Sequence, residues 1–140
     1  TRFIEVSGDG LEKLSNIFQE FAQNHLEDVS DATLEKYKQA PFRAPMIVIL
    51  VSTIKEHPKV PALEQMFSTA TAGQNILLAL NALGFGGIWR TGKFAMNKQI
   101  GSFLGLEHNQ EVLGYLYIGT PVGDNKKIPE LDPENFVKKL

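Results

Sequence analysis

A glycine-rich stretch at residues 83–92 holds the residue types best suited to binding chemistry. It reads Leu-Gly-Phe-Gly-Gly-Ile-Trp-Arg-Thr-Gly, so glycines surround one Trp and one Arg. Glycine reaches positive φ angles and has no Cβ, so a glycine cluster between a helix and a strand lets a planar or phosphorylated ligand lie against the main chain. Arg90 would add positive charge. A tight turn after a helix is the alternative explanation of these glycines.

Other chemistries lack their motifs in this sequence. The dinucleotide-binding fingerprint needs Gly-x-Gly-x-x-Gly after a strand and before a helix, whereas these glycines follow a helical pattern. A P-loop would need Gly-Lys-Ser/Thr, and a serine hydrolase Gly-x-Ser-x-Gly. His25, His57 and His108 have no metal-ligand spacing and no cysteine beside them, so we predict no metal site.

The glycine-rich stretch carries a family resemblance when its flanks are included. With Gln74-Asn75 before it and Gly-Tyr-Leu-Tyr-Ile-Gly-Thr-Pro at 114–121 after it, it resembles the FMN-dependent nitroreductase family, in particular the small bacterial NAD(P)H-using branch. The resemblance runs from Phe3 to about Pro121. Members of that family normally begin with a helix carrying an Arg-Arg-Ser phosphate-binding motif. This chain opens at Thr1 without that motif, so we expect it to lack the N-terminal part of the family domain.

The resemblance implies two groups of binding residues. Trp89, Arg90, Thr91 and Gly92 match the segment that lies along FMN, with Arg90 as a charge favouring the anionic reduced flavin. A second group matches the stretch that relatives use for NADH or NADPH: Ala79, Leu80, Asn81, Ala82, Leu83 and Gly84. Core packing by the leucines is the alternative for this group. No catalytic side chain is expected, because the cofactor carries the chemistry.

The same resemblance implies a function. Hydride would pass from NAD(P)H through FMN to an electron-poor acceptor such as a nitroaromatic or a quinone. Two copies would form a homodimer with FMN at the interface. One alternative is a non-catalytic or truncated dimerisation module that has lost FMN. Another is a flavin enzyme of different chemistry, such as a reductive dehalogenase. Arg43, between two prolines, is a candidate for binding a phosphate or for a surface role.

Hydrophobic patterning predicts the elements that must position these residues. A strand at 3–6 precedes a helix that begins in a capping-box-like pattern at Asp9 and Glu12. Its apolar residues fall on one stripe that we expect to pack on a sheet: Leu11, Leu14, Phe18 and Phe21. The apolar run at 46–51 predicts a central strand covered on both faces. The remaining predictions are helices at 32–39, 62–83 and 96–104, strands at 88–89 and 112–118, and a polar C-terminal arm at 122–140. We therefore expect one α+β domain over 1–140, a mixed sheet flanked by helices.

The predicted long helix at 62–83 has more apolar surface than one sheet needs. Small residues at Ala70 and Gly73 would let another helix approach closely, and Gly84 is the expected C-terminal stop. Two adjacent apolar stripes on this helix favour burial against a second copy of the chain.

Composition narrows the class of protein. The chain has 140 residues, of which 43% are hydrophobic and 21% are charged, as in one globular domain. A formal net charge of -2 argues against nucleic-acid and anionic-membrane binding, both of which need a basic excess. The absence of cysteine excludes disulfides and thiolate metal sites. No signal peptide or long apolar run is present, so we expect the cytoplasm.

Overall fold

A computed structural model describes residues 1–123 and 127–140 of the chain. The sheet has the strand order β1-β2-β4-β3. Its strands are β1 (Arg2–Ser7), β2 (Met46–Thr53), β3 (Gly86–Arg90) and β4 (Gln110–Gly119). The helices are α1 (Asp9–His25), α2 (Asp31–Gln39), α3 (Ala62–Ala82) and α4 (Lys98–Phe103). Three short 3-10 turns are η1 (Ala40–Arg43), η2 (Gly92–Phe94) and η3 (Pro133–Asn135).

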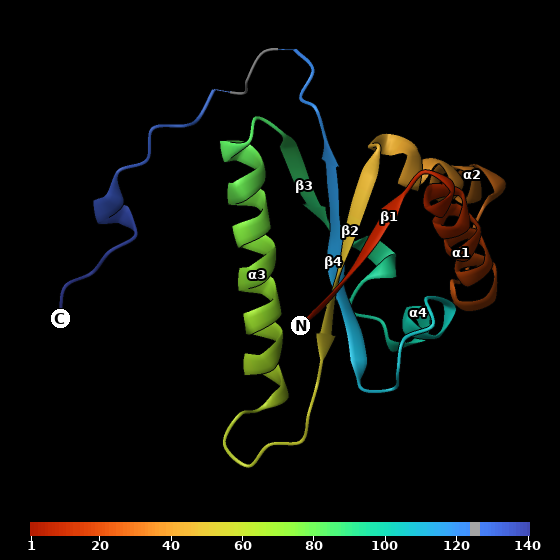
Figure 1. Ribbon diagram of the computed structural model, residues 1–140, viewed down its shortest axis with the longest axis horizontal. Helices are drawn as coiled ribbons and strands as arrows, with labels where there is room; N and C mark the ends of the chain where they lie inside the picture. Colours follow the sequence, from red (N-terminus) through yellow and green to blue (C-terminus); the bar gives the residue numbers. More distant parts are fainter. Residues whose placement is uncertain (124–126) are drawn as a thin grey trace.

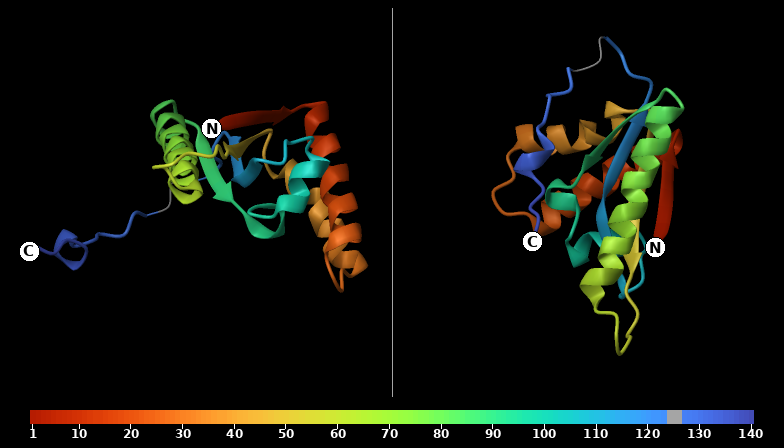
Figure 2. Two further views of the ribbon diagram at one scale, coloured as in Figure 1. Left: turned by 90° about the horizontal axis from the view of Figure 1, so that it is seen from below. Right: turned by 90° about the vertical axis from the view of Figure 1, so that its left-hand side faces the viewer.

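The helices cover the two faces of the sheet unequally (Figures 1 and 2). α3 alone lies on one face, whereas α1, α2 and α4 lie on the other. The α+β class is therefore confirmed. The expectation of a mixed sheet is wrong for the described strands, because all three neighbouring pairs are antiparallel. The segment that holds α1 and α2 leaves the sheet after Ser7 and rejoins it at the same end at Met46. These two residues are therefore paired between β1 and β2.

β2 is an interior strand, as the apolar run predicted. Ile47, Ile49 and Val51 belong to the core under α1, and Leu50 belongs to the core under α3. The apolar stripe of α1 faces the first core: Leu11, Leu14, Phe18 and Phe21 are buried. Phe18 stacks on Phe94 with ring centroids 4.0 Å apart.

Two helix starts differ from their predictions. Gly8 is the N-cap of α1, and no side chain caps that helix, so the predicted capping box is wrong. The φ of Gly8 is 52°, which glycine adopts readily, and Asp9 then falls inside the first turn. α4 begins at Lys98 rather than at 96, because Met96 has a φ of 54° and the side chain of Asn97 accepts the Gln99 N–H.

α3 ends as predicted, but Gly73 packs against the sheet rather than against another helix. Gly84 has a φ of 81°, and the Phe85 N–H donates to the Leu80 carbonyl, which completes a Schellman motif. The expectation of a helix crossing at Gly73 is not met within the described chain. A Cβ there would lie 2.5 Å from Leu50 and 2.9 Å from Trp89, so the small residue lets the sheet approach.

The polar arm predicted at 122–140 follows β4. Part of it, 124–126, lies outside the described residues. The part from 127 onward is exposed, holds only the turn η3, and extends away from the sheet in the figures.

Candidate cofactor site beside strand β3

β3 lies at one edge of the sheet and divides the predicted FMN residues between two faces. Ile88 pairs with Tyr117, Trp89 with Leu116, and Arg90 with Tyr115. Side chains alternate along a strand, so Trp89 points toward α3 while Ile88 and Arg90 point to the opposite face.

Trp89 anchors this strand. Its indole lies against two glycines, Gly73 of α3 and Gly114 of β4, where an added Cβ would collide with the ring. It also packs on the core that contains Leu50 and Leu116. The side chain of Trp89 therefore holds β3 in place, which leaves its main chain for contact with a ligand.

The neighbouring glycines are required for different structural reasons. A Cβ on Gly87 would lie 2.6 Å from Leu77 and 3.2 Å from Leu80, so this glycine lets α3 pack against β3. Gly92, the first residue of η2, has a φ of 62° and needs the left-handed conformation. The cluster thus combines helix packing with a turn that leads into η2.

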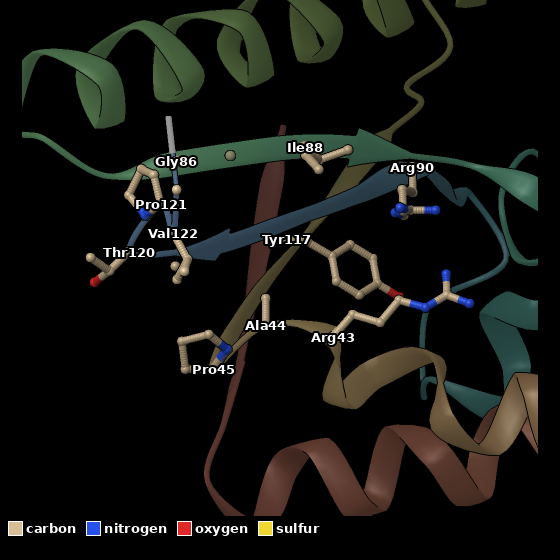
Figure 3. A pocket seen from close by; sticks show the side chains of 13 residues that line it. Arg43, Ala44, Pro45, Gly86, Ile88, Arg90, Tyr117, Thr120, Pro121 and Val122 are labelled. Carbon is tan, nitrogen blue, oxygen red and sulfur yellow. The ribbon is translucent and has the colours of Figure 1, made fainter. Parts of the chain in front are cut away.

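Two cavities lie on the face opposite α3. The first has a volume of about 470 Å³ and is drawn in Figure 3. Its apolar wall includes Pro45, Ile88, Pro121 and Val122. The second has a volume of about 360 Å³, and its lining includes Lys36, Tyr37, Thr91, Gly92 and Lys93. Arg43 and Arg90 line both cavities.

The charge around these cavities is positive. Lys36, Arg43, Arg90 and Lys93 supply cations, and no Asp or Glu among the described residues lines either cavity. Within 1–123 and 127–140, the one ion pair joins Lys38 to Glu35 elsewhere on α2. The site therefore suits an anionic ligand.

Tyr117 lies between the two arginines. Its ring centroid is 5.8 Å from the guanidinium carbon of Arg90, and Figure 3 shows its phenol directed toward Arg43. Burial raises the pKa of Tyr117, and the charges of Arg43 and Arg90 act in the opposite direction. The phenol is thus a neutral hydroxyl beside two cations at neutral pH.

These residues fit FMN. The cofactor has a planar ring and an anionic phosphate, and the two cavities offer flat apolar walls and cationic side chains. Arg90, Thr91 and Gly92 all line the smaller cavity and Arg90 also lines the larger one, whereas Trp89 lines neither. The assignment of residues 89–92 to FMN binding stays a prediction. Tyr117 lies in the 114–121 stretch that carries the family resemblance, which assigned it no role, whereas Lys36 and Lys93 have no linear motif that could have identified them.

The predicted NAD(P)H segment occupies the end of α3. Leu80 packs near Gly87, as the core alternative expected, while Leu83 is exposed. None of the six residues of this segment lines either of the two cavities: Ala79, Leu80, Asn81, Ala82, Leu83 and Gly84. Its role in binding NADH or NADPH stays a prediction.

No three His, Cys, Asp or Glu side chains among the described residues come together as a metal site. No helix in the described part of the chain has the length and apolarity needed to cross a membrane.

Comparisons with known proteins place the chain in a family. Residues 1–120 match the Nitroreductase family. "Putative NAD(P)H nitroreductase YdjA" of Escherichia coli K12 is 35% identical over 136 residues, which cover 96% of this chain and 73% of that protein. A nitroreductase-like family protein from Bacillus cereus has the same fold, with a TM-score of 0.81 at 16% identity over 99% of this chain and 72% of its own. The chain therefore belongs to the nitroreductase family.

Proposed function

We propose that this protein is an FMN-dependent oxidoreductase that passes hydride from NAD(P)H through FMN to an electron-poor acceptor such as a nitroaromatic or a quinone. The observation that carries the proposal is the cation-rich cavity lined by Arg90, Thr91 and Gly92, beside a second cavity that shares Arg43 and Arg90 with it. The name of the YdjA relative supports NAD(P)H as the donor. A Clostridium difficile protein described as an FMN-dependent nitroreductase shares the fold, with a TM-score of 0.64 at 19% identity.

The chain's own residues would bind and orient the cofactor. FMN, when bound, supplies the site that accepts and then donates hydride. Thr91 offers a hydroxyl and Gly92 a main-chain N–H, both from a turn fixed by the left-handed φ of Gly92. Arg90 offers a positive charge beside the flavin, which favours an anionic reduced ring.

The cofactor assignment can be tested on purified protein. Oxidised flavin absorbs at roughly 450 nm, so we expect a yellow protein whose absorbance bleaches on anaerobic addition of NADH or NADPH. Gly92→Val should lower the affinity for FMN, because a β-branched residue does not adopt the left-handed conformation. Ile128→Val, in the exposed arm, is the matched control. A colourless protein that does not take up added FMN would refute the proposal.

We further propose a homodimer that covers the outer surface of α3. Leu63, Phe67 and Leu78 of this helix are 58%, 57% and 60% exposed and recur along one stripe. Exposed apolar stripes of this kind mark protein interfaces. The arm at 127–140, exposed in the single chain, would lie on the partner. The cytoplasm stays our prediction for the compartment.

Light scattering tests the assembly. Wild type should have the mass of a dimer at micromolar concentration, and the double substitution Phe67→Glu, Leu78→Glu should shift it to a monomer, because charges would be buried unpaired. Phe3→Glu on β1 introduces the same charge at another exposed phenylalanine and should leave the dimer intact. A monomeric wild type would contradict this proposal.

A further inference from the structure

The larger cavity has two chemically different ends. Its apolar part includes Pro45, Ile88 and Pro121, and its cationic part is formed by Arg43 and Arg90 with Tyr117 between them. Figure 3 shows Thr120, Pro121 and Val122 at one end and the arginines at the other. A cavity built this way fits a ligand with a flat apolar body and an anionic group at one end.

Arg43 is presented by a well-anchored segment. It ends η1, in which Ala40 and Pro41 are buried, and Pro45 follows two residues later. The prolines fix their own φ angles, so the main chain that carries Arg43 has little freedom. Within the described residues no carboxylate pairs with Arg43. Its planar group of N–H donors is thus available to a ligand, and this geometry matches a carboxylate.

The charges exceed what the cofactor's phosphate would neutralise. A phosphate monoester carries about -1.5 to -2 at pH 7. Four cations surround the two cavities: Lys36, Arg43, Arg90 and Lys93. The two lysines line only the smaller cavity, beside Thr91 and Gly92, where a phosphate could take up their charge. Of the two remaining cations, Arg90 lies beside the flavin in the proposed function, so the charge of Arg43 is left for another anion.

Building on the proposed function, we propose that the electron acceptor carries a carboxylate, which Arg43 binds with Arg90 beside it while the acceptor's ring lies against Pro45, Ile88 and Pro121. The Tyr117 hydroxyl adds a neutral donor between the two guanidinium groups. Burial of Tyr117 raises its pKa, so this hydroxyl keeps its proton at neutral pH and does not repel the anion.

A matched pair of acceptors tests the charge directly. 4-Nitrobenzoate and 4-nitrobenzamide have nearly the same shape, but only the first is anionic. For the flavin-loaded protein we expect Arg43→Gln to lower kcat/KM for 4-nitrobenzoate relative to 4-nitrobenzamide at least tenfold, because a charge-assisted hydrogen bond is lost. Arg43→Lys should restore part of this ratio. Arg2→Gln, which removes a distant arginine on β1, should leave the ratio within twofold of wild type.

A binding measurement separates this proposal from the cofactor assignment. Benzoate is not reducible, so calorimetric titration reports the anion site with or without FMN. We expect wild type to bind benzoate and Arg43→Gln to bind it at least tenfold more weakly, with the affinity for FMN within twofold of wild type. If benzoate binds both proteins equally, the proposal is overturned. It is also overturned if Arg43→Gln lowers kcat/KM for both acceptors alike and weakens FMN binding tenfold, because Arg43 would then hold the cofactor.

Discussion

The sheet has a closed region and an open region, and they differ in what holds them together. The closed region is the core between α1, α4 and the strands β2 and β4, where aromatic rings contact one another around Phe18, Phe94 and Tyr115. The open region is the edge strand β3 with α3 and the two cavities. There, Trp89 is only partly buried, Ile88 and Arg90 are exposed, and α3 presents apolar side chains outward.

This difference separates stability from binding. In the closed region polar groups are few and satisfied: the Tyr115 hydroxyl donates to the Phe94 carbonyl at 2.6 Å. In the open region cations surround the cavities on one face of the sheet, and α3 exposes apolar side chains on the other. Substitutions in the closed region should therefore change the free energy of unfolding, and substitutions in the open region should mainly change ligand binding and assembly.

Phe18→Ala should have the largest effect. Phe18 is buried, stacks on Phe94 and meets Tyr115 edge-on at 5.4 Å, so its loss should cost about 3–5 kcal/mol of unfolding free energy. Urea denaturation followed by circular dichroism measures this cost. Phe3→Ala, at an exposed phenylalanine, should cost less than about 1 kcal/mol. Equal costs for the two would show that the closed core is not the main source of stability.

Gly87→Val should have the next largest effect, in the open region. Its Cβ would meet Leu77 and Leu80, so α3 and β3 must separate, at about 1–3 kcal/mol. Affinity for FMN should fall as well, because the main chain that leads to Thr91 moves. Thermal unfolding and flavin fluorescence titration report the two effects. An unchanged melting temperature would mean that α3 does not rest on β3.

Tyr115→Phe should cost roughly 1–2 kcal/mol at neutral pH, because it leaves the buried Phe94 carbonyl without its donor. It should also change how the free energy of unfolding depends on pH in the alkaline range. Burial raises the pKa of Tyr115 above its ordinary value of 10.0, so the unfolded chain loses this proton first as the pH rises. The contribution of the protonated Tyr115 hydroxyl to the free energy of unfolding is complete below pH 10 and is lost as the pH rises above it. Wild-type stability should fall more steeply above pH 10 than that of the variant. Parallel curves would contradict this.

Arg90→Ala should have the smallest effect on the free energy of unfolding and a measurable effect on the midpoint potential of the flavin. Arg90 is exposed, so the free energy of unfolding should change by less than about 0.5 kcal/mol. The midpoint potential should fall by roughly 10–30 mV, because the anionic reduced flavin loses a favourable charge. Arg2→Ala is the control for net charge. If both the potential and the affinity for FMN stay at wild-type values, Arg90 is only a solvated strand residue.

Local patterns predicted most elements of the fold. The strands predicted at 46–51 and 112–118 correspond to β2 and β4. The helical periodicity of Leu11, Leu14, Phe18 and Phe21 identified the buried face of α1. These predictions held because burial of a periodic apolar stripe is decided within one element. The predicted cap of α1 failed, because the chain enters that helix through the positive φ of Gly8, and a side-chain pattern does not encode that entry.

The site shows the limit of sequence reasoning. The stretch with Arg90, Thr91 and Gly92 carried its own signal, and the structure places these residues together beside a cavity. Arg43 was identified only through its flanking prolines and Tyr117 only as part of the 114–121 stretch, and no pattern identified Lys36 or Lys93. Trp89 and Arg90 are adjacent in sequence but point to opposite faces, because side chains alternate on a strand.

By itself the sequence determined the element order and the buried stripe of α1 and indicated a candidate ligand-binding stretch, since each depends on residues close together along the chain. Only the tertiary structure decided that Gly73 and Gly87 serve packing between α3 and the sheet, because their contacts lie on other elements. Only it brought Arg43 of η1 and Arg90 of β3 to one cavity beside Tyr117 of β4. Strand pairing across the sheet sets those positions, and pairing depends on contacts between distant segments.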